Sequence, residues 1–139
     1  MKRLFSILLL IPLAAFAGGA IVVENAWVRE APPGASMMAA YLVIRNPGDN
    51  AVELVGVDSP DFAHVRMHKS ETVDGMARMI HRDSLTIPAH SSVALKPGGF
   101  HLMMPAPTTR LVQGDKVELL LHFADERCVR ATAVVRKKP

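Results

Sequence analysis

Hydrophobic and polar residues alternate along many short stretches of the chain. In Lys116–Phe123, apolar residues occupy every second position from Val117 to Phe123. Side chains two positions apart lie on the same face of an extended strand, so this pattern predicts a strand with one buried face. Alternation or a β-rich composition predicts strands over Ile21–Arg29, Met38–Arg45, Ala51–Val57, Ala63–Lys69, Met76–His81, Ser92–Leu95, Lys116–Phe123 and Cys128–Val135.

Turn-forming residues separate these predicted strands at short intervals. Asp74-Gly75 and Gly114-Asp115 are two-residue turn signals, and Asn46–Asn50 combines Asn, Pro, Gly and Asp. No long stretch has the period of about 3.6 residues that an amphipathic helix needs. Short strands joined by frequent turns predict an antiparallel β-sandwich or barrel.

The first 17 residues have the features of a secretory signal peptide. A basic start, Met1-Lys2-Arg3, precedes the apolar stretch Leu4–Phe16. Ala15 and Ala17 place small residues at the −3 and −1 positions of a cleavage site. We expect cleavage after Ala17 and export of one domain over residues 18–139. Because the apolar stretch is short and no cysteine lies near the cleavage point, we expect no stable membrane anchor and no lipid anchor.

Charge and composition exclude several classes of partner and site. The chain has 16 basic and 13 acidic residues, and loss of Lys2 and Arg3 with the signal peptide lowers the formal net charge from +3 to +1. The longest basic run is Arg136-Lys137-Lys138 and only 5% of residues are aromatic, so we expect no nucleic-acid partner. The single cysteine, Cys128, excludes an internal disulfide framework and a multi-thiolate zinc site.

Methionine and histidine are unusually frequent, with 8 and 6 copies, and some of them are spaced to meet. A two-residue type I′ turn at Asp74-Gly75 would place His68 opposite His81 and make Met79 a diagonal neighbour of His68 on the same face. Diagonal pairs lie about 7–8 Å apart, which is close enough for two long side chains to reach one ion. A register slip of one residue would put His68 and Met79 on opposite faces.

A second pair follows in the segment Gly98–Pro105. His101 and Met103 are two residues apart, so in an extended segment their side chains project to the same side. The flanking glycines and proline favour a strand end or loop at the rim of the sandwich. Two imidazoles and two thioethers form a plausible four-coordinate set, and the soft, neutral thioether sulfur favours Cu(I). Methionine also suits an oxidising compartment, where paired thiols would form disulfides.

The spacing of these four residues resembles the H(M)X10MX21HXM motif of the PCuAC-type periplasmic copper chaperones. The motif is carried by Met67-His68, Met79 and His101-Leu102-Met103. The similarity extends over nearly all of residues 18–139. Its wider frame is Ala26-Trp27-Val28-Arg29, Ala39-Ala40-Tyr41 leading to Asn46, Asp74-Gly75-Met76 and Pro97-Gly98-Gly99-Phe100.

The resemblance implies a fold, a cargo and a destination. It implies an all-β fold, an antiparallel cupredoxin-like or Ig-like β-sandwich. It also implies that the protein binds Cu(I) in the periplasm and delivers it to the CuA centre of cytochrome c oxidase subunit II, often beside Sco-type thiol proteins. The metal ligands carried over are His68, Met79, His101 and Met103. Strand alternation turns Met67 away from that face, so it is left out of the ligand set.

Several alternatives stay open at this point. His81 could be an alternate ligand or support one, since the predicted register places it opposite His68. An electron-transfer blue-copper site is excluded because no His or Met follows Cys128. A copper enzyme would need open coordination and a histidine-rich site, whereas this set contains two thioethers, so we expect no enzyme. A copper-buffering or resistance protein, and a metal-free subunit-binding sandwich, are the remaining hypotheses.

Overall fold

The computed structural model describes residues 19–138, and the expected signal peptide lies outside them. Within this range the chain forms ten β-strands and no helix, and therefore no helix that could cross a membrane. The strands are β1 (Val22–Arg29), β2 (Met37–Asn46), β3 (Val52–Asp58), β4 (Arg66–Val73), β5 (Met76–His81), β6 (Leu85–Ile87), β7 (Ser91–Leu95), β8 (Phe100–Pro105), β9 (Lys116–Phe123) and β10 (Cys128–Arg136).

All eight segments predicted from the sequence form strands, and two further strands were not predicted. β4 is shifted toward the C-terminus, beginning at Arg66 rather than Ala63. β6 has only three residues, which is too short to display an alternating pattern. Of the two alternatives predicted around His101, a strand end or a loop, the loop is wrong: His101 is the second residue of β8, a strand paired with β2 on one side and β4 on the other.

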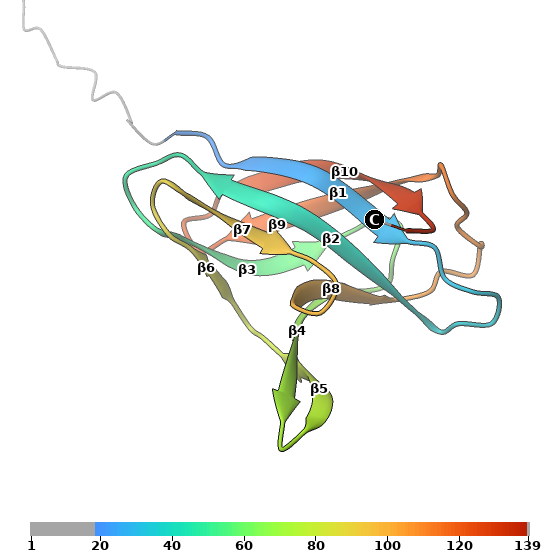
Figure 1. The fold of residues 1–139 in the computed structure, drawn as a ribbon. Coiled ribbons are helices and arrows are strands. Elements are labelled where there is room, and N and C mark those ends of the chain that lie inside the picture. Colours follow the sequence, from blue (N-terminus) through green and yellow to red (C-terminus); the bar gives the residue numbers. More distant parts are fainter. Residues whose placement is uncertain (1–18, 139) are drawn as a thin grey trace, which may run out of the picture.

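The fold is an all-β sandwich, as predicted (Figure 1). The strands follow the order β5-β4-β8-β2-β1-β10-β9-β3-β6, with β7 also paired to β2. Every pairing is antiparallel except that of β1 with β10, where Trp27 lies opposite Val134. This single parallel pair joins the first strand of the chain to the last, a connection that local periodicity does not encode.

The core lies between strands far apart in the sequence. Leu42 and Ile44 on β2 are fully buried in the same cluster as Leu119 and Leu121 on β9. The alternating apolar positions of Lys116–Phe123 are all buried, as the sequence predicted. Three methionines also belong to this cluster and fill core positions rather than surface ones, as is common for this flexible side chain. They are Met38, Met67 and Met104.

The β4–β5 hairpin extends away from the body of the sandwich (Figure 1). Its two turn residues, Asp74 and Gly75, have positive φ values of 51° and 74°, as a type I′ turn requires. The predicted register is therefore present, with Val73 opposite Met76. β5 is the last strand at this edge of the sheet, so the hairpin presents one free backbone edge.

Candidate metal centre

Three histidines form a row across three neighbouring strands. His68 on β4 lies opposite His81 on β5 and opposite His101 on β8. The His68 and His101 rings are stacked, with centroids 5.9 Å apart and planes 19° from parallel. The His68 and His81 rings meet edge to face, with centroids 5.4 Å apart. Because residues directly opposite one another share a face, all three imidazoles lie on one side of the sheet.

Met79 and Met103 lie on the same face, at diagonal positions on opposite sides of His68. Met79 is opposite Ser70, two residues after His68, and Met103 is opposite Arg66, two residues before it. The four residues proposed from the sequence thus share one face of three adjacent strands. Met67 points the other way and is buried in the core, as the alternation indicated.

The environment of His101 leaves one of its ring nitrogens free. His101 is only 4% exposed. Nδ1 lies 3.1 Å from the carbonyl oxygen of Gly99, which can only accept a hydrogen bond, so Nδ1 donates. In the neutral ring the lone pair is then on Nε2, which is buried and has no hydrogen-bond partner within residues 19–138. A backbone carbonyl that fixes the tautomer in this way is typical of metal-binding histidines.

His68 is also held in a form that can bind a metal. Its Nδ1 is buried without a hydrogen-bond partner in the described part of the chain. Burial lowers the pKa of His68 below its ordinary value of 6.5, and the nearby His101 and His81 rings lower it further. A lowered pKa keeps the imidazole neutral at neutral pH, and only the neutral ring offers a lone pair to a metal.

Exposure increases from β8 toward β5. His101 is buried, Met103 and His68 are half-buried, and Met79 is 62% exposed. The His81 side chain is 50% exposed, and its Nε2 lies 3.0 Å from Oδ1 of Asp83. The row is therefore closed at the β8 side and open to solvent at the hairpin edge.

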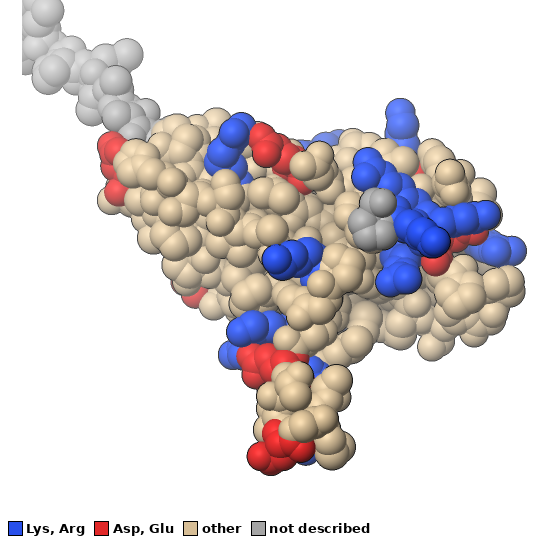
Figure 2. All heavy atoms as spheres, viewed as in Figure 1, with Lys and Arg blue, Asp and Glu red and all other residues tan. Residues whose placement is uncertain are grey.

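Polar contacts hold the three strands together around the row. The Lys69 ammonium on β4 lies 5.3 Å from the centre of the Phe100 ring on β8. Glu71 bonds Arg82 at 2.6 Å and Lys69 at 3.3 Å, and these two cations lower the pKa of its carboxyl. Figure 2 shows acidic and basic side chains side by side on the projecting hairpin, well apart in this view from the basic group near the C-terminal end. The Lys69–Phe100 contact thus links the hairpin strand β4 to β8, and the Glu71–Arg82 ion pair links it to the residue after β5.

Within residues 19–138, carboxylate and cysteine ligands are not grouped at the histidine row. Residues 19–138 contain no group of three or more His, Cys, Asp or Glu side chains arranged to hold a metal ion. Cys128 is exposed on β10 and lies opposite His122 of β9, away from β4 and β8 in the strand order. The metal-binding donors that share this face of the described strands are the imidazoles of the row and the thioethers of Met79 and Met103.

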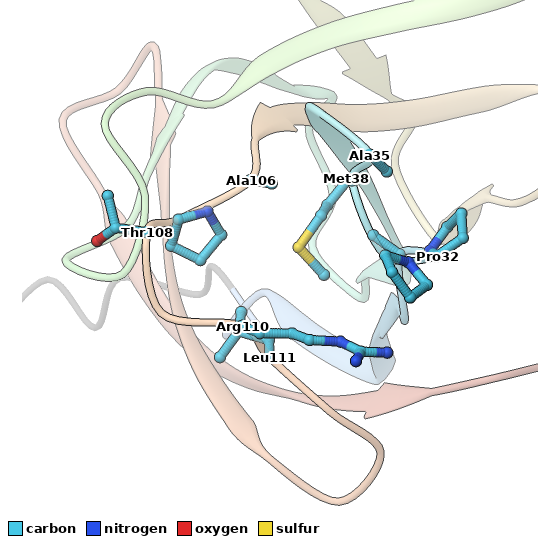
Figure 3. A pocket seen from close by; sticks show the side chains of 11 residues that line it. Pro32, Ala35, Met38, Ala106, Thr108, Arg110 and Leu111 are labelled. Atoms are coloured by element: carbon cyan, nitrogen blue, oxygen red, sulfur yellow. The ribbon is translucent and has the colours of Figure 1, made fainter.

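A cavity of about 160 Å³ lies elsewhere, between the β1–β2 loop and the segment after β8. Figure 3 shows Met38 projecting into it from β2, near Arg110 and Leu111. None of the proposed ligands lines this cavity, so it is separate from the histidine row.

Sequence comparison places the chain in a family. A family model described as "Putative lipoprotein LpqE-like" matches residues 21–135. The chain belongs to the LpqE-like family. Putative lipoprotein Lxx21020 of Leifsonia xyli subsp. xyli is 33% identical to it over 106 residues, which are 76% of this chain and 63% of the relative. The uncharacterized protein RP573 of Rickettsia prowazekii is 26% identical over 91 residues, 65% of this chain and 50% of the relative. The chain thus spans about half to two thirds of the length of these curated relatives.

Solved structures with the same fold include PCuAC domains. The copper-bound PCuAC domain from PmoF2 is 27% identical, with a TM-score of 0.70 over 89% of this chain and 97% of that domain. The CuI-DR1885 structure from Deinococcus radiodurans is 31% identical, with a TM-score of 0.69 over 90% of this chain and 83% of that one. The resemblance to the PCuAC type that the sequence motif suggested is therefore confirmed for this LpqE-like chain.

The sequence predicted that His68 and Met79 share one face and that His101 and Met103 share one side, but not everything around them. The hydrogen bond from His101 to the Gly99 carbonyl was not predicted, because every residue has a backbone carbonyl and no sequence pattern distinguishes this one. Sequence analysis also did not note that Met79 and His81 repeat on β5 the two-residue spacing of His101 and Met103 on β8. That spacing was visible in the sequence, but its meaning depends on both strands flanking β4.

Proposed function

We propose that this protein is a periplasmic metallochaperone that carries one Cu(I) ion on His68, Met79, His101 and Met103. The observation that supports this most directly is the pairing of His68 with His101, each with a buried ring nitrogen that has no hydrogen-bond partner among residues 19–138. The two methionines lie on the same face, one on each side of this pair. The copper-bound state of the related PmoF2 domain and the Cu(I) state of DR1885 support the choice of metal.

The ligand chemistry favours Cu(I) held reversibly. Thioether sulfur is soft and prefers Cu(I) to Zn²⁺ or Mg²⁺, while imidazole accepts copper in either oxidation state. All four proposed ligands are neutral, so the site keeps only the charge of the ion. Without thiolates the ion is not trapped, and an acceptor that offers thiolates can remove it. No step of this role changes a covalent bond in a substrate, so we propose carriage without catalytic turnover.

The proposed acceptor is the CuA centre of cytochrome c oxidase subunit II, with a Sco-type thiol protein acting in the same process. This part of the proposal rests on the PCuAC resemblance together with the exposed position of Met79, which a partner can approach. The proposed periplasmic location rests on the signal-peptide features of residues 1–17. The description of the family as lipoprotein-like is in keeping with export.

The decisive experiment is an anaerobic Cu(I) titration of residues 18–139 against a chromophoric competitor, with X-ray absorption on the loaded protein. We expect one equivalent of Cu(I) and mixed nitrogen and sulfur scattering. The variant with alanine at all four positions should lose this binding. Tight binding by that variant would refute the ligand assignment, and no binding by the wild-type chain would leave a metal-free subunit-binding sandwich as the better hypothesis.

Delivery is tested separately from binding. We expect a deletion strain to lose oxidase activity under copper limitation and to recover it with added copper. A strain with normal oxidase activity but increased copper sensitivity would instead indicate a buffering or resistance protein.

A further inference from the structure

We propose that His81 is an exchange ligand, which takes hold of the copper ion as the ion leaves toward an acceptor. This inference rests on the function proposed above. It adds a fifth donor to the four carried over from the motif and gives the route of release a direction, from β8 toward the free edge of β5.

The donors form two matching half-sites that share His68. On β8, His101 and Met103 are two residues apart, and on β5, Met79 and His81 are two residues apart. Both histidines lie opposite His68, and the two methionines occupy the diagonal positions on either side of it. Each half-site therefore offers one imidazole and one thioether to an ion held at His68. We name them the inner half-site (His101 and Met103) and the outer half-site (Met79 and His81).

The two half-sites differ sharply in accessibility. In the inner half-site His101 is buried, and Met103 is half-buried. In the outer half-site Met79 is 62% exposed and the His81 side chain is 50% exposed. The inner half-site can protect the ion from solvent, whereas the outer half-site can be reached by another protein.

His81 is prepared for this role by Asp83. Nε2 of His81 lies 3.0 Å from the Asp83 carboxylate, which can only accept, so Nε2 donates and the lone pair of the neutral ring is on Nδ1. A carboxylate behind an imidazole orients the ring and makes it a better ligand. The ring of His81 already contacts that of His68, with centroids 5.4 Å apart.

Exchange at the shared histidine conserves charge and oxidation state. The Cu–N bond to His68 and the Cu–S bond to Met79 persist while the bonds to His101 Nε2 and Met103 Sδ break and a bond to His81 Nδ1 forms. Copper stays Cu(I), no proton is transferred, and Met79 stays available in both arrangements. Each intermediate thus keeps at least two protein ligands, so the ion need not pass through solvent.

The test is the rate at which excess bathocuproine disulfonate removes Cu(I) from the loaded protein in an anaerobic stopped-flow experiment. We expect His81→Ala to slow release several-fold while lowering the equilibrium affinity far less than His101→Ala does. His81→Met, which keeps a soft donor on the outer half-site, should restore most of the rate. The matched control is His90→Asn, which removes another exposed histidine paired with an aspartate, 2.9 Å from Asp49 but outside the row. Asparagine is used because His90 has a positive φ of 53°.

The outcomes separate this inference from the proposed function. Equal release rates for wild-type protein and His81→Ala would overturn the exchange role while leaving the four-ligand site intact. A loss of affinity as large as that of His101→Ala would make His81 a resident ligand and would also overturn it. Failure of the wild-type protein to bind Cu(I) would overturn the proposed function, and the exchange role with it.

Discussion

His68 and His101 lie directly opposite each other on β4 and β8, with nearly parallel rings 5.9 Å apart. Two imidazolium ions this close would repel each other, and burial adds a further cost to charging His68, which lowers its pKa. In the proposed Cu(I) site both rings would stay neutral, and each would present a lone pair to the ion. The same closeness makes the site sensitive to protons.

Copper affinity should therefore depend on pH in a defined direction. Because the pKa of His68 is held below 6.5, proton competition at this residue should be slight at neutral pH and should weaken Cu(I) binding in more acidic solution. The unfolded chain binds a proton at His68 more readily than the folded chain, so the apo protein should also lose stability as pH falls below 6.5. Competitive titrations from about pH 7.5 to about pH 5 measure the first effect. Constant affinity over that range would contradict ligation by the histidines.

The effect of replacing a hairpin methionine on Cu(I) affinity should depend on the face of the hairpin on which that methionine lies. Met79 and Met76 are on the same strand and almost equally exposed, at 62% and 60%, but they point to opposite faces. We expect Met79→Ala to lower Cu(I) affinity by about 10–100-fold, on the scale seen when metal sites lose a supporting group. Met76→Ala should leave it unchanged. Both variants should fold normally, since surface substitutions usually change stability by less than about 0.5 kcal/mol. Equal effects of the two substitutions would argue against a role for Met79.

The hairpin shows which features a sequence can predict and which it cannot. The register that brings His68 to His81 was predictable because Asp74-Gly75 favours one turn type, and that turn fixes every pair along the two strands. β8 was not among the predicted strands because the glycines and proline around His101 suggested a strand end or loop at the rim. Its strand state depends on pairing with β2 and β4, which are distant in the sequence. The strand order, including the parallel β1–β10 pair, follows from long-range pairing and is not visible in local patterns.

A substitution in the β4–β5 turn tests whether the pairing of these two strands is needed for copper binding. Gly75 has a φ of 74°, in a region where an added Cβ is strained whatever the free space around it. We expect Gly75→Ala to destabilise the protein by about 1–2 kcal/mol and to weaken Cu(I) binding by loosening the position of Met79. Urea denaturation and the copper titration measure the two effects.

Gly56→Ala is the control for that substitution. An added Cβ at Gly56 would meet nothing within 4 Å, and its backbone does not have a positive φ. It should therefore leave copper binding unchanged. A Gly75→Ala protein as stable as this control would show that the tight turn does not determine the hairpin.

Asn46 at the end of β2 should be essential for stability rather than for copper binding. It is 1% exposed, its amide nitrogen lies 2.8 Å from the Asn50 carbonyl and 3.1 Å from that of Ile87, and its oxygen accepts from the Gly48 amide at 3.0 Å. Removing it leaves buried groups without partners, at about 1–3 kcal/mol each. Asn46→Ala should thus lower the unfolding free energy by about 3 kcal/mol, with Asn50→Ala as the control, since only the backbone of Asn50 takes part. A loss no larger than that of the control would contradict this role.

The parallel pairing of β1 with β10 has a consequence for how the protein is made. The middle of the sheet is formed by the first and last strands of the described chain, so β1 has only β2 as a neighbour until residues up to Arg136 are available. β3 likewise cannot pair with β9 until residues up to Phe123 have been synthesised, although it can pair earlier with β6. Contacts of such long sequence separation form slowly. A growing chain therefore cannot complete the middle of this sheet until the residues of β10, up to Arg136, have been synthesised.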